Sequence, residues 1–242
     1  MIGGARQLPL ELPHRPALDR ADFLVTRANE LAVAWIDHWP NWPQPALVLH
    51  GPEGSGKTHL TRVWQRTSGA AVIDADALGR ETPMRLVGDA RTAVVEDVGR
   101  CLRRSDAPEA VARGLLHLYN VLGERGGHVL VTDATPAKAW PAPLPDLASR
   151  LGAATHVALG APDDTLLAAV MVKLFADRQL TVPPDVVQYL LPRIERSFAA
   201  VRAVVAQLDR AALARRQAIT VPLAREVLSH ADLGDEIGRG GT

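Results

Sequence analysis

The chain has 242 residues, of which 47% are hydrophobic and 22% charged, and its 27 basic and 27 acidic side chains cancel. This length accommodates one large domain or a core with a smaller companion, and the apolar content suffices for a buried core. The balanced charge argues against a dedicated DNA-binding domain, because such domains neutralise many phosphates with a basic excess.

Cysteine content and hydropathy exclude further classes of protein. Cys101 is the single cysteine, which excludes an intramolecular disulfide and a Cys/His zinc pattern. No apolar stretch approaches the roughly 18 residues of a transmembrane helix, and residues 1–12 lack the apolar region of a secretory signal. We expect a cytoplasmic protein without a membrane partner.

The N-terminal region predicts a tail followed by one helix. Residues 1–22 contain three prolines among scattered charges and are expected to form a flexible tail. From about Thr26, apolar residues repeat at helical spacing. This helix must end before the Trp39–Pro43 segment, because a proline disfavours helical geometry in the residue before it.

Five short apolar runs then alternate with helical segments. Continuous apolar strands separated by helices are typical of a parallel sheet that is covered on both faces. The sequence therefore predicts an α/β domain over residues 23–160. The expected strands are Ala46–Leu49, Ala70–Ile73, Ala93–Val95, Val129–Val131 and His156–Leu159.

Only helical patterns follow Pro162. Pro162-Asp163-Asp164 places a proline and two acidic groups where a helix start favours them. Residues 161–242 are therefore predicted to form a small all-helical domain. Its expected helices are 163–180, 184–193, 198–216 and 221–230.

A phosphate-binding motif follows the first predicted strand. Gly51-Pro52-Glu53-Gly54-Ser55-Gly56-Lys57-Thr58 matches G-x-x-x-x-G-K-[ST] and precedes a helical segment at Leu60–Trp64. Glycines let backbone N–H groups converge on phosphate oxygens, Lys57 adds a positive charge, and Thr58 can hold Mg²⁺. We expect ADP or ATP to bind with Mg²⁺. The candidate contacts are Gly51, Glu53, Gly54, Ser55, Gly56, Lys57, Thr58 and His59.

Two carboxylates follow the third predicted strand. Glu96 and Asp97 stand where one can hold Mg²⁺ through water and the other can polarise an attacking water. The alternative is an acidic pair that merely ends the strand. Since a glutamate is longer than the aspartate usual at the first position, metal geometry and turnover stay open.

Further segments resemble the AAA+ ATPases, specifically the branch of the bacterial replication initiator DnaA. Phe23-Leu24-Val25 is similar to the segment that encloses the adenine, which implies contacts from Leu24 and Val25. Val129-Leu130-Val131-Thr132-Asp133 is similar to sensor 1, with Asp133 near the γ-phosphate. Leu147-Ala148-Ser149-Arg150-Leu151 resembles the arginine-finger segment, and Ala200-Val201-Arg202-Ala203-Val204 resembles the lid. The resemblance implies catalytic roles for Asp133 and Arg150 and a nucleotide contact from Arg202.

The tail resembles another known element. Gln7-Leu8-Pro9-Leu10-Glu11-Leu12 is similar to the Q-L-x-L-x-L peptides that bind the bacterial sliding clamp. The leucines Leu8, Leu10 and Leu12 would insert into a surface groove while Gln7 hydrogen-bonds beside it. Full initiators also carry a separate N-terminal domain and a helix-turn-helix domain, which we do not expect here.

The combination implies a negative regulator of replication initiation. Bound to the DNA-loaded clamp, it would present Arg150 to DnaA-bound ATP and stimulate its hydrolysis, with DnaA and the clamp as partners and little direct DNA binding. A homodimer or higher oligomer is expected. One alternative is an autonomous AAA+ motor or helicase loader, and another is a passive nucleotide-dependent adaptor. Intrinsic ATPase activity stays open.

Overall fold

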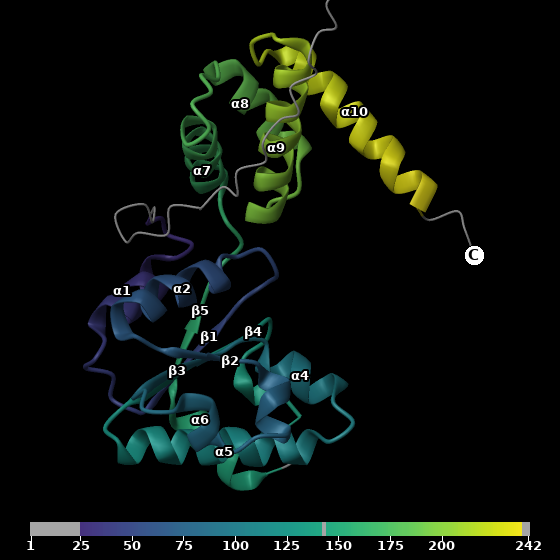
Figure 1. The fold of residues 1–242 in the computed structure, drawn as a ribbon. Coiled ribbons are helices and arrows are strands. Elements are labelled where there is room, and N and C mark those ends of the chain that lie inside the picture. Colours follow the sequence, from purple (N-terminus) through teal and green to yellow (C-terminus); the bar gives the residue numbers. More distant parts are fainter. Residues whose placement is uncertain (1–24, 142–143, 239–242) are drawn as a thin grey trace, which may run out of the picture.

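The computed structural model describes residues 25–141 and 144–238. These residues form an α/β part, which holds the strands, and a helical part that follows it in sequence and lies beyond one edge of the sheet (Figure 1). In these two described ranges, no helix is both long and apolar enough to cross a membrane. The predicted α/β fold followed by helices is confirmed.

The sheet consists of parallel strands in the order β2-β3-β4-β1-β5. Strand β1 lies between β4 and β5, so that Leu47 pairs with Leu130 on one side and Thr155 on the other. Ala46 to Leu49 are buried, because helices cover both faces of the sheet. The strands are β1 (Ala46–His50), β2 (Ala71–Ile73), β3 (Thr92–Val95), β4 (His128–Asp133) and β5 (Thr155–Ala158).

Alternate residues of β1 point to two different cores. Ala46 and Val48 pack with one group of helices, whereas Leu47 and Leu49 pack with the other. The first face is covered by α3 (Pro83–Val87), α4 (Val98–Arg104), α5 (Pro108–Glu124) and α6 (Pro145–Ala153). The opposite face is covered by α1 (Glu30–His38) and α2 (Lys57–Ser68).

The helical part has a core of its own. Its buried residues include Leu167, Phe175, Val201 and Leu208, which come from two of its helices. Helix α7 ends at Ala176, earlier than predicted, and Gln179 just beyond it adopts a left-handed φ of 59°. The helices are α7 (Asp164–Ala176), α8 (Pro184–Leu190), α9 (Phe198–Arg215) and α10 (Val221–Gly238).

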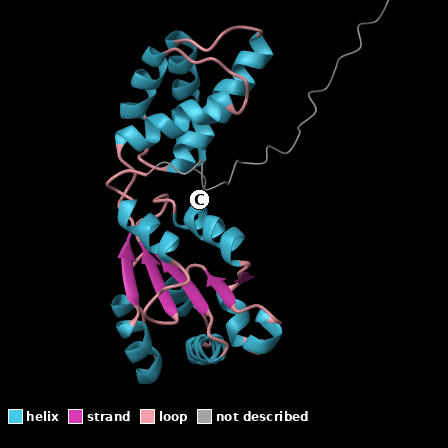
Figure 2. Ribbon diagram, turned by 90° about the vertical axis from the view of Figure 1, so that its left-hand side faces the viewer, coloured by secondary structure: helices cyan, strands magenta, loops and turns pink. Residues whose placement is uncertain are grey.

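The direction of the strands places their carboxyl ends toward the helical part (Figure 2). Ligands of open parallel sheets bind outside this edge, where loops leave the strands. The loop after β1, which carries the predicted phosphate motif, therefore lies between the sheet and the helices α7–α10.

Candidate functional site

The phosphate motif forms the loop that joins β1 to α2. Gly54 and Gly56 both adopt left-handed backbone conformations, with φ of 74° and 101°, which other residues adopt at a cost. Gly56 is the N-cap of α2, so the first free N–H groups of this helix open onto the loop. Such a helix start attracts anions, and phosphate oxygens fit this position.

Lys57 lies over the loop that precedes it. Its side chain is buried, and Nζ donates hydrogen bonds to Gly51 O at 2.6 Å and Pro52 O at 2.9 Å. Burial lowers the pKa of the Lys57 ammonium, while the negative charges of Asp97, Asp133 and other nearby carboxylates oppose this change. The structure thus holds a positive charge beside the position that a phosphate would occupy.

Ser55 carries a buried hydroxyl without a partner. The side chain is 4% exposed, and Oγ has no hydrogen-bond partner among the residues that the structure describes. Buried hydroxyl groups are normally hydrogen-bonded. A phosphate oxygen at the loop would supply the missing partner, so the loop fits a nucleotide. Glu53, the next predicted contact, lies exposed on the same loop.

The structure brings Glu96 and Thr58 together, as metal binding requires. Thr58 Oγ1 donates to Glu96 Oε2 at 3.2 Å, and Thr61 Oγ1 donates to Glu96 Oε1. No group of three or more His, Cys, Asp or Glu side chains in the described ranges forms a metal cage. Mg²⁺ is commonly held by one or two protein oxygens together with phosphates and waters, and Thr58 with Glu96 fits that arrangement. Sequence reasoning missed Thr61.

Asp97 lies beside this pair but is turned differently. It is the N-cap residue of α4 and has a left-handed φ of 55°, and its backbone N–H donates to Thr132 Oγ1 at 3.2 Å. Its carboxylate is 3.9 Å from Arg100 and about half exposed. That Asp97 polarises an attacking water stays a prediction.

Asp133 is completely buried and bonded to its surroundings. Its carboxylate accepts from the backbone N–H groups of Arg100 and Thr135, from the Thr135 hydroxyl, and from Arg103 at 3.1 Å. Burial by itself would raise the pKa of Asp133, but these hydrogen bonds outweigh it and lower the pKa. The side chain therefore ties α4 to β4. Its predicted contact with the γ-phosphate stays a prediction.

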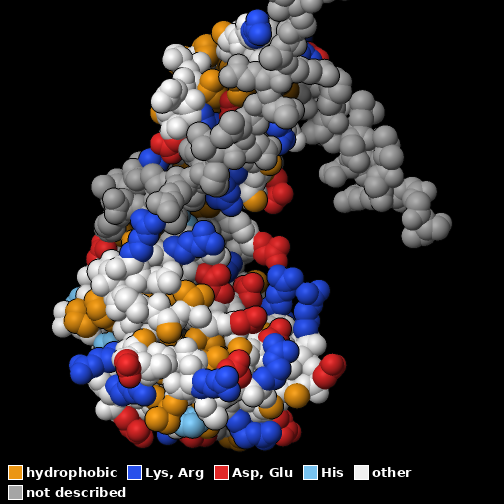
Figure 3. Space-filling model, in the orientation of Figure 1, with side chains coloured by type: hydrophobic (Ala, Val, Ile, Leu, Met, Phe, Trp, Pro, Cys, Tyr) orange, Lys and Arg blue, Asp and Glu red, His pale blue; other side chains and the backbone are white. Residues whose placement is uncertain are grey.

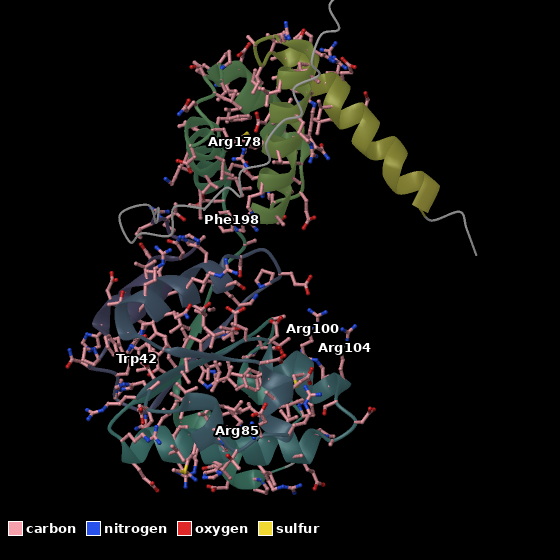
Figure 4. All side chains as sticks on the ribbon, viewed as in Figure 1. Trp42, Arg85, Arg100, Arg104, Arg178 and Phe198 are labelled. Atoms are coloured by element: carbon pink, nitrogen blue, oxygen red, sulfur yellow. The ribbon has the colours of Figure 1, made fainter. Side chains whose placement is uncertain are left out.

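The helical part touches the phosphate loop at the start of α9. A Cβ atom on Gly54 would lie 2.6 Å from Ser197 Cβ, and one on Gly56 would lie 3.0 Å from the Phe198 ring. Phe198 lies at the end of α9 nearest the α/β part (Figure 4). Arg202 is exposed one helical turn further along α9. This places the predicted nucleotide contact on the helix that covers the loop.

The remaining predicted residues lie elsewhere. Val25 is half exposed, and the segment after it is joined to the end of β5 by a hydrogen bond from Gly160 N to Ala28 O. His59 lies on α2. Leu24 and the predicted clamp contacts Gln7, Leu8, Leu10 and Leu12 are outside the described residues.

Arg150 lies on α6, on the opposite face of the sheet from α2. Its Nε is 3.2 Å from Asp146 Oδ1, and its guanidinium stands 5.5 Å from the centre of the Tyr119 ring. The side chain is 40% exposed. The structure thus does not bring Arg150 to the loop of its own chain.

Comparisons with known proteins match both parts of the chain. Residues 164–228 match the family model described as Hda, lid domain. Domain III of the Thermotoga maritima replication initiation protein DnaA superposes with a TM-score of 0.76 at 16% identity, covering 90% of this chain and 98% of that domain. AMPPCP-bound DnaA from Aquifex aeolicus gives a TM-score of 0.61 at 16% identity, and the match covers 76% of this chain and 62% of that one.

A third likeness shows that the fold is shared more widely. The RuvB Holliday junction branch migration motor of Thermotoga maritima matches with a TM-score of 0.60 at 13% identity, covering 76% of this chain and 61% of RuvB. The α/β part and its helices therefore have the AAA+ fold. The predicted resemblance to the DnaA branch is confirmed at the level of the fold. The helical part matches the family model of the Hda lid domain.

Proposed function

We propose that this chain, an AAA+ protein related to Hda by its lid and to DnaA by its fold, negatively regulates the initiation of chromosomal replication. The observation that carries the proposal is the lid match over residues 164–228, because this lid contacts an intact phosphate loop through Ser197 and Phe198. The protein would act on the initiator as a nucleotide-bound partner.

The nucleotide would be ADP or ATP with Mg²⁺. Lys57, the backbone of Gly54 to Gly56 and the Ser55 hydroxyl would hold the phosphates. Thr58 and Glu96 would hold the metal ion, and Arg202 would reach the nucleotide from the lid. The bound metal ion would neutralise phosphate charge. Two DnaA structures with this fold are described as bound to AMPPCP, which supports a bound nucleotide in this chain as well.

Arg150 is proposed to act on a neighbouring molecule. It lies on the opposite face of the sheet from α2 and is partly exposed, which supports a role at an interface. A guanidinium supplied in trans stabilises the charge that develops during phosphoryl transfer. We propose that Arg150 serves ATP bound to DnaA, and that the same kind of contact permits a homodimer or higher oligomer.

The tail is proposed to bring the protein to DNA through the sliding clamp. Gln7, Leu8, Leu10 and Leu12 would bind the clamp while it encircles DNA. Direct DNA binding would contribute little, because acidic and basic side chains are interspersed over the face seen in Figure 3. Strong phosphate neutralisation would need basic side chains clustered in a patch or stripe.

The test follows conversion of DnaA-bound ATP to ADP in the presence of clamps loaded on DNA. We expect the protein to accelerate this conversion, and omission of the clamp or the change Gln7→Ala to remove most of the acceleration. Pro13→Ala, in the same tail but outside the proposed clamp peptide, is the matched control and should retain it. An unchanged rate with the wild-type protein would overturn the proposed function.

The intact Thr58–Glu96 pair favours one second candidate, an autonomous AAA+ motor or helicase loader. A motor would turn over ATP by itself, with or without the clamp. Steady-state ATPase measurements on the isolated protein separate the two functions. Robust turnover that ignores DnaA and the clamp would favour the motor, and weak turnover would favour the regulator.

A further inference from the structure

Thr61 is a polar residue in the buried stripe of α2. Its side chain is 1% exposed, beside the buried apolar residues Leu60 and Trp64. The hydroxyl lies 3.0 Å from Thr58 O, one turn earlier in the helix, and also donates to Glu96 Oε1. The carboxylate is the stronger acceptor, because it is charged.

Glu96 is therefore held by two hydroxyl groups of the same helix. Oε2 accepts from Thr58 and Oε1 accepts from Thr61, so each carboxylate oxygen has a different partner. A glutamate has one more rotatable bond than an aspartate and loses more side-chain freedom when it is fixed. A second anchor on Oε1 restricts that freedom and keeps Oε2 directed at Thr58.

We propose that Thr61 is a positioning residue of the nucleotide site, which adapts the site to a glutamate at position 96. It acts through Glu96 and does not itself touch the nucleotide. The inference rests on the proposed nucleotide binding, since Thr58 and Glu96 are the residues proposed to hold Mg²⁺. We therefore expect loss of the Thr61 hydroxyl to weaken nucleotide binding in the presence of Mg²⁺. Binding of the phosphates by the loop without Mg²⁺ should not change.

The test measures the Kd of a fluorescent ADP analogue in Mg²⁺ and again in EDTA. Thr61→Val keeps the side-chain volume and removes the hydroxyl. We expect it to weaken binding about tenfold in Mg²⁺, the size of one hydrogen bond to a charged group, and to leave the Kd in EDTA unchanged within about twofold. Thr61→Ser keeps the donor and should restore the Mg²⁺ effect.

Thr67→Val is the matched control, because Thr67 is on the same helix and its hydroxyl bonds, among the residues that the structure describes, only to Val63 O. Its Kd should equal that of the wild type in both conditions. Thr61→Ala also removes the hydroxyl and should change the two Kd values as Thr61→Val does. It replaces Thr61→Val in the test if that variant lowers the melting temperature. In the Glu96→Gln background, Thr61→Val should weaken Mg²⁺-dependent binding much less than in the wild type.

Two results would overturn the inference. These are an unchanged ratio of the Kd in Mg²⁺ to the Kd in EDTA in Thr61→Val and Thr61→Ala, or a Thr61→Ser variant as weak as Thr61→Val. Each would leave the regulatory function standing. By contrast, a wild-type protein that binds the analogue and shows the Thr61 effect, but does not accelerate hydrolysis of DnaA-bound ATP, would refute the regulator and support the positioning role.

Discussion

The ammonium group of Lys57 is bonded to Gly51 O and Pro52 O of its own loop, and its pKa is lowered by burial against the opposing effect of nearby carboxylates. Neither bond joins separate parts of the fold. Lys57→Ala should therefore leave the melting temperature close to that of the wild type while it lowers nucleotide affinity by at least about tenfold, the loss of a charge-assisted bond. Titration with a fluorescent ADP analogue measures this, and undiminished binding would contradict the role of Lys57.

For Asp133 we expect a loss of stability instead, because its hydrogen bonds hold α4 against β4. Asp133→Asn should lower the free energy of unfolding by about 1–3 kcal/mol, since the amide NH2 would face the backbone N–H of either Arg100 or Thr135, which then loses its acceptor. A folded pKa below the ordinary value means that the Asp133 contribution is present above the unfolded pKa of about 3.9 and is lost as pH falls through the folded pKa.

Urea unfolding at a series of pH values checks this expectation. The difference between the wild type and Asp133→Asn should stay constant from pH 7 to about pH 5 and shrink below about pH 4. A difference that grows on acidification would show that the Asp133 pKa is raised in the folded state.

At the scale of elements, the start of α9 packs in close contact with the phosphate loop. Gly54→Ala would place a Cβ atom 2.6 Å from Ser197 Cβ, whereas Gly69→Ala would meet nothing within 4 Å. Both positions have φ near 70°, so both substitutions cost about 1–2 kcal/mol of backbone energy. Only Gly54→Ala should also displace the lid and weaken nucleotide binding. Equal unfolding energies and equal affinities for the two variants would show that the contact with Ser197 is unimportant.

Elements with strong local patterns were predictable from the sequence. The buried strands show as apolar runs, and the glycines and Lys57 show the phosphate loop directly. Helix α4 escaped prediction, because Val98–Arg104 is short and follows a left-handed Asp97 without a side-chain cap. The sheet order depends on pairing between distant segments. Thr61 and Glu96 are 35 residues apart, so nothing local in the sequence indicates their contact.

At the scale of the whole molecule, the proposed nucleotide site and Arg150 lie on separate surfaces, which we propose to serve different partners. Helix α2, which the phosphate loop precedes, lies on one face of the sheet with α1, while Arg150 lies on α6 on the opposite face. Mixed charge over the face seen in Figure 3 agrees with recruitment to DNA through another protein. The resemblance found in the sequence implied a finger at Arg150, but only the structure places it away from its own nucleotide site.

Single-turnover hydrolysis of DnaA-bound ATP, with clamps loaded on DNA, tests the central claim most directly when Arg150→Ala is compared with Arg113→Ala. Arg113 forms the same kind of exposed helical ion pair, with Glu109 at 3.4 Å, and controls for loss of surface charge. The wild-type protein and Arg113→Ala should accelerate hydrolysis equally. Arg150→Ala should still bind nucleotide and clamp but leave the rate at that of DnaA alone. Full acceleration by Arg150→Ala would contradict the account.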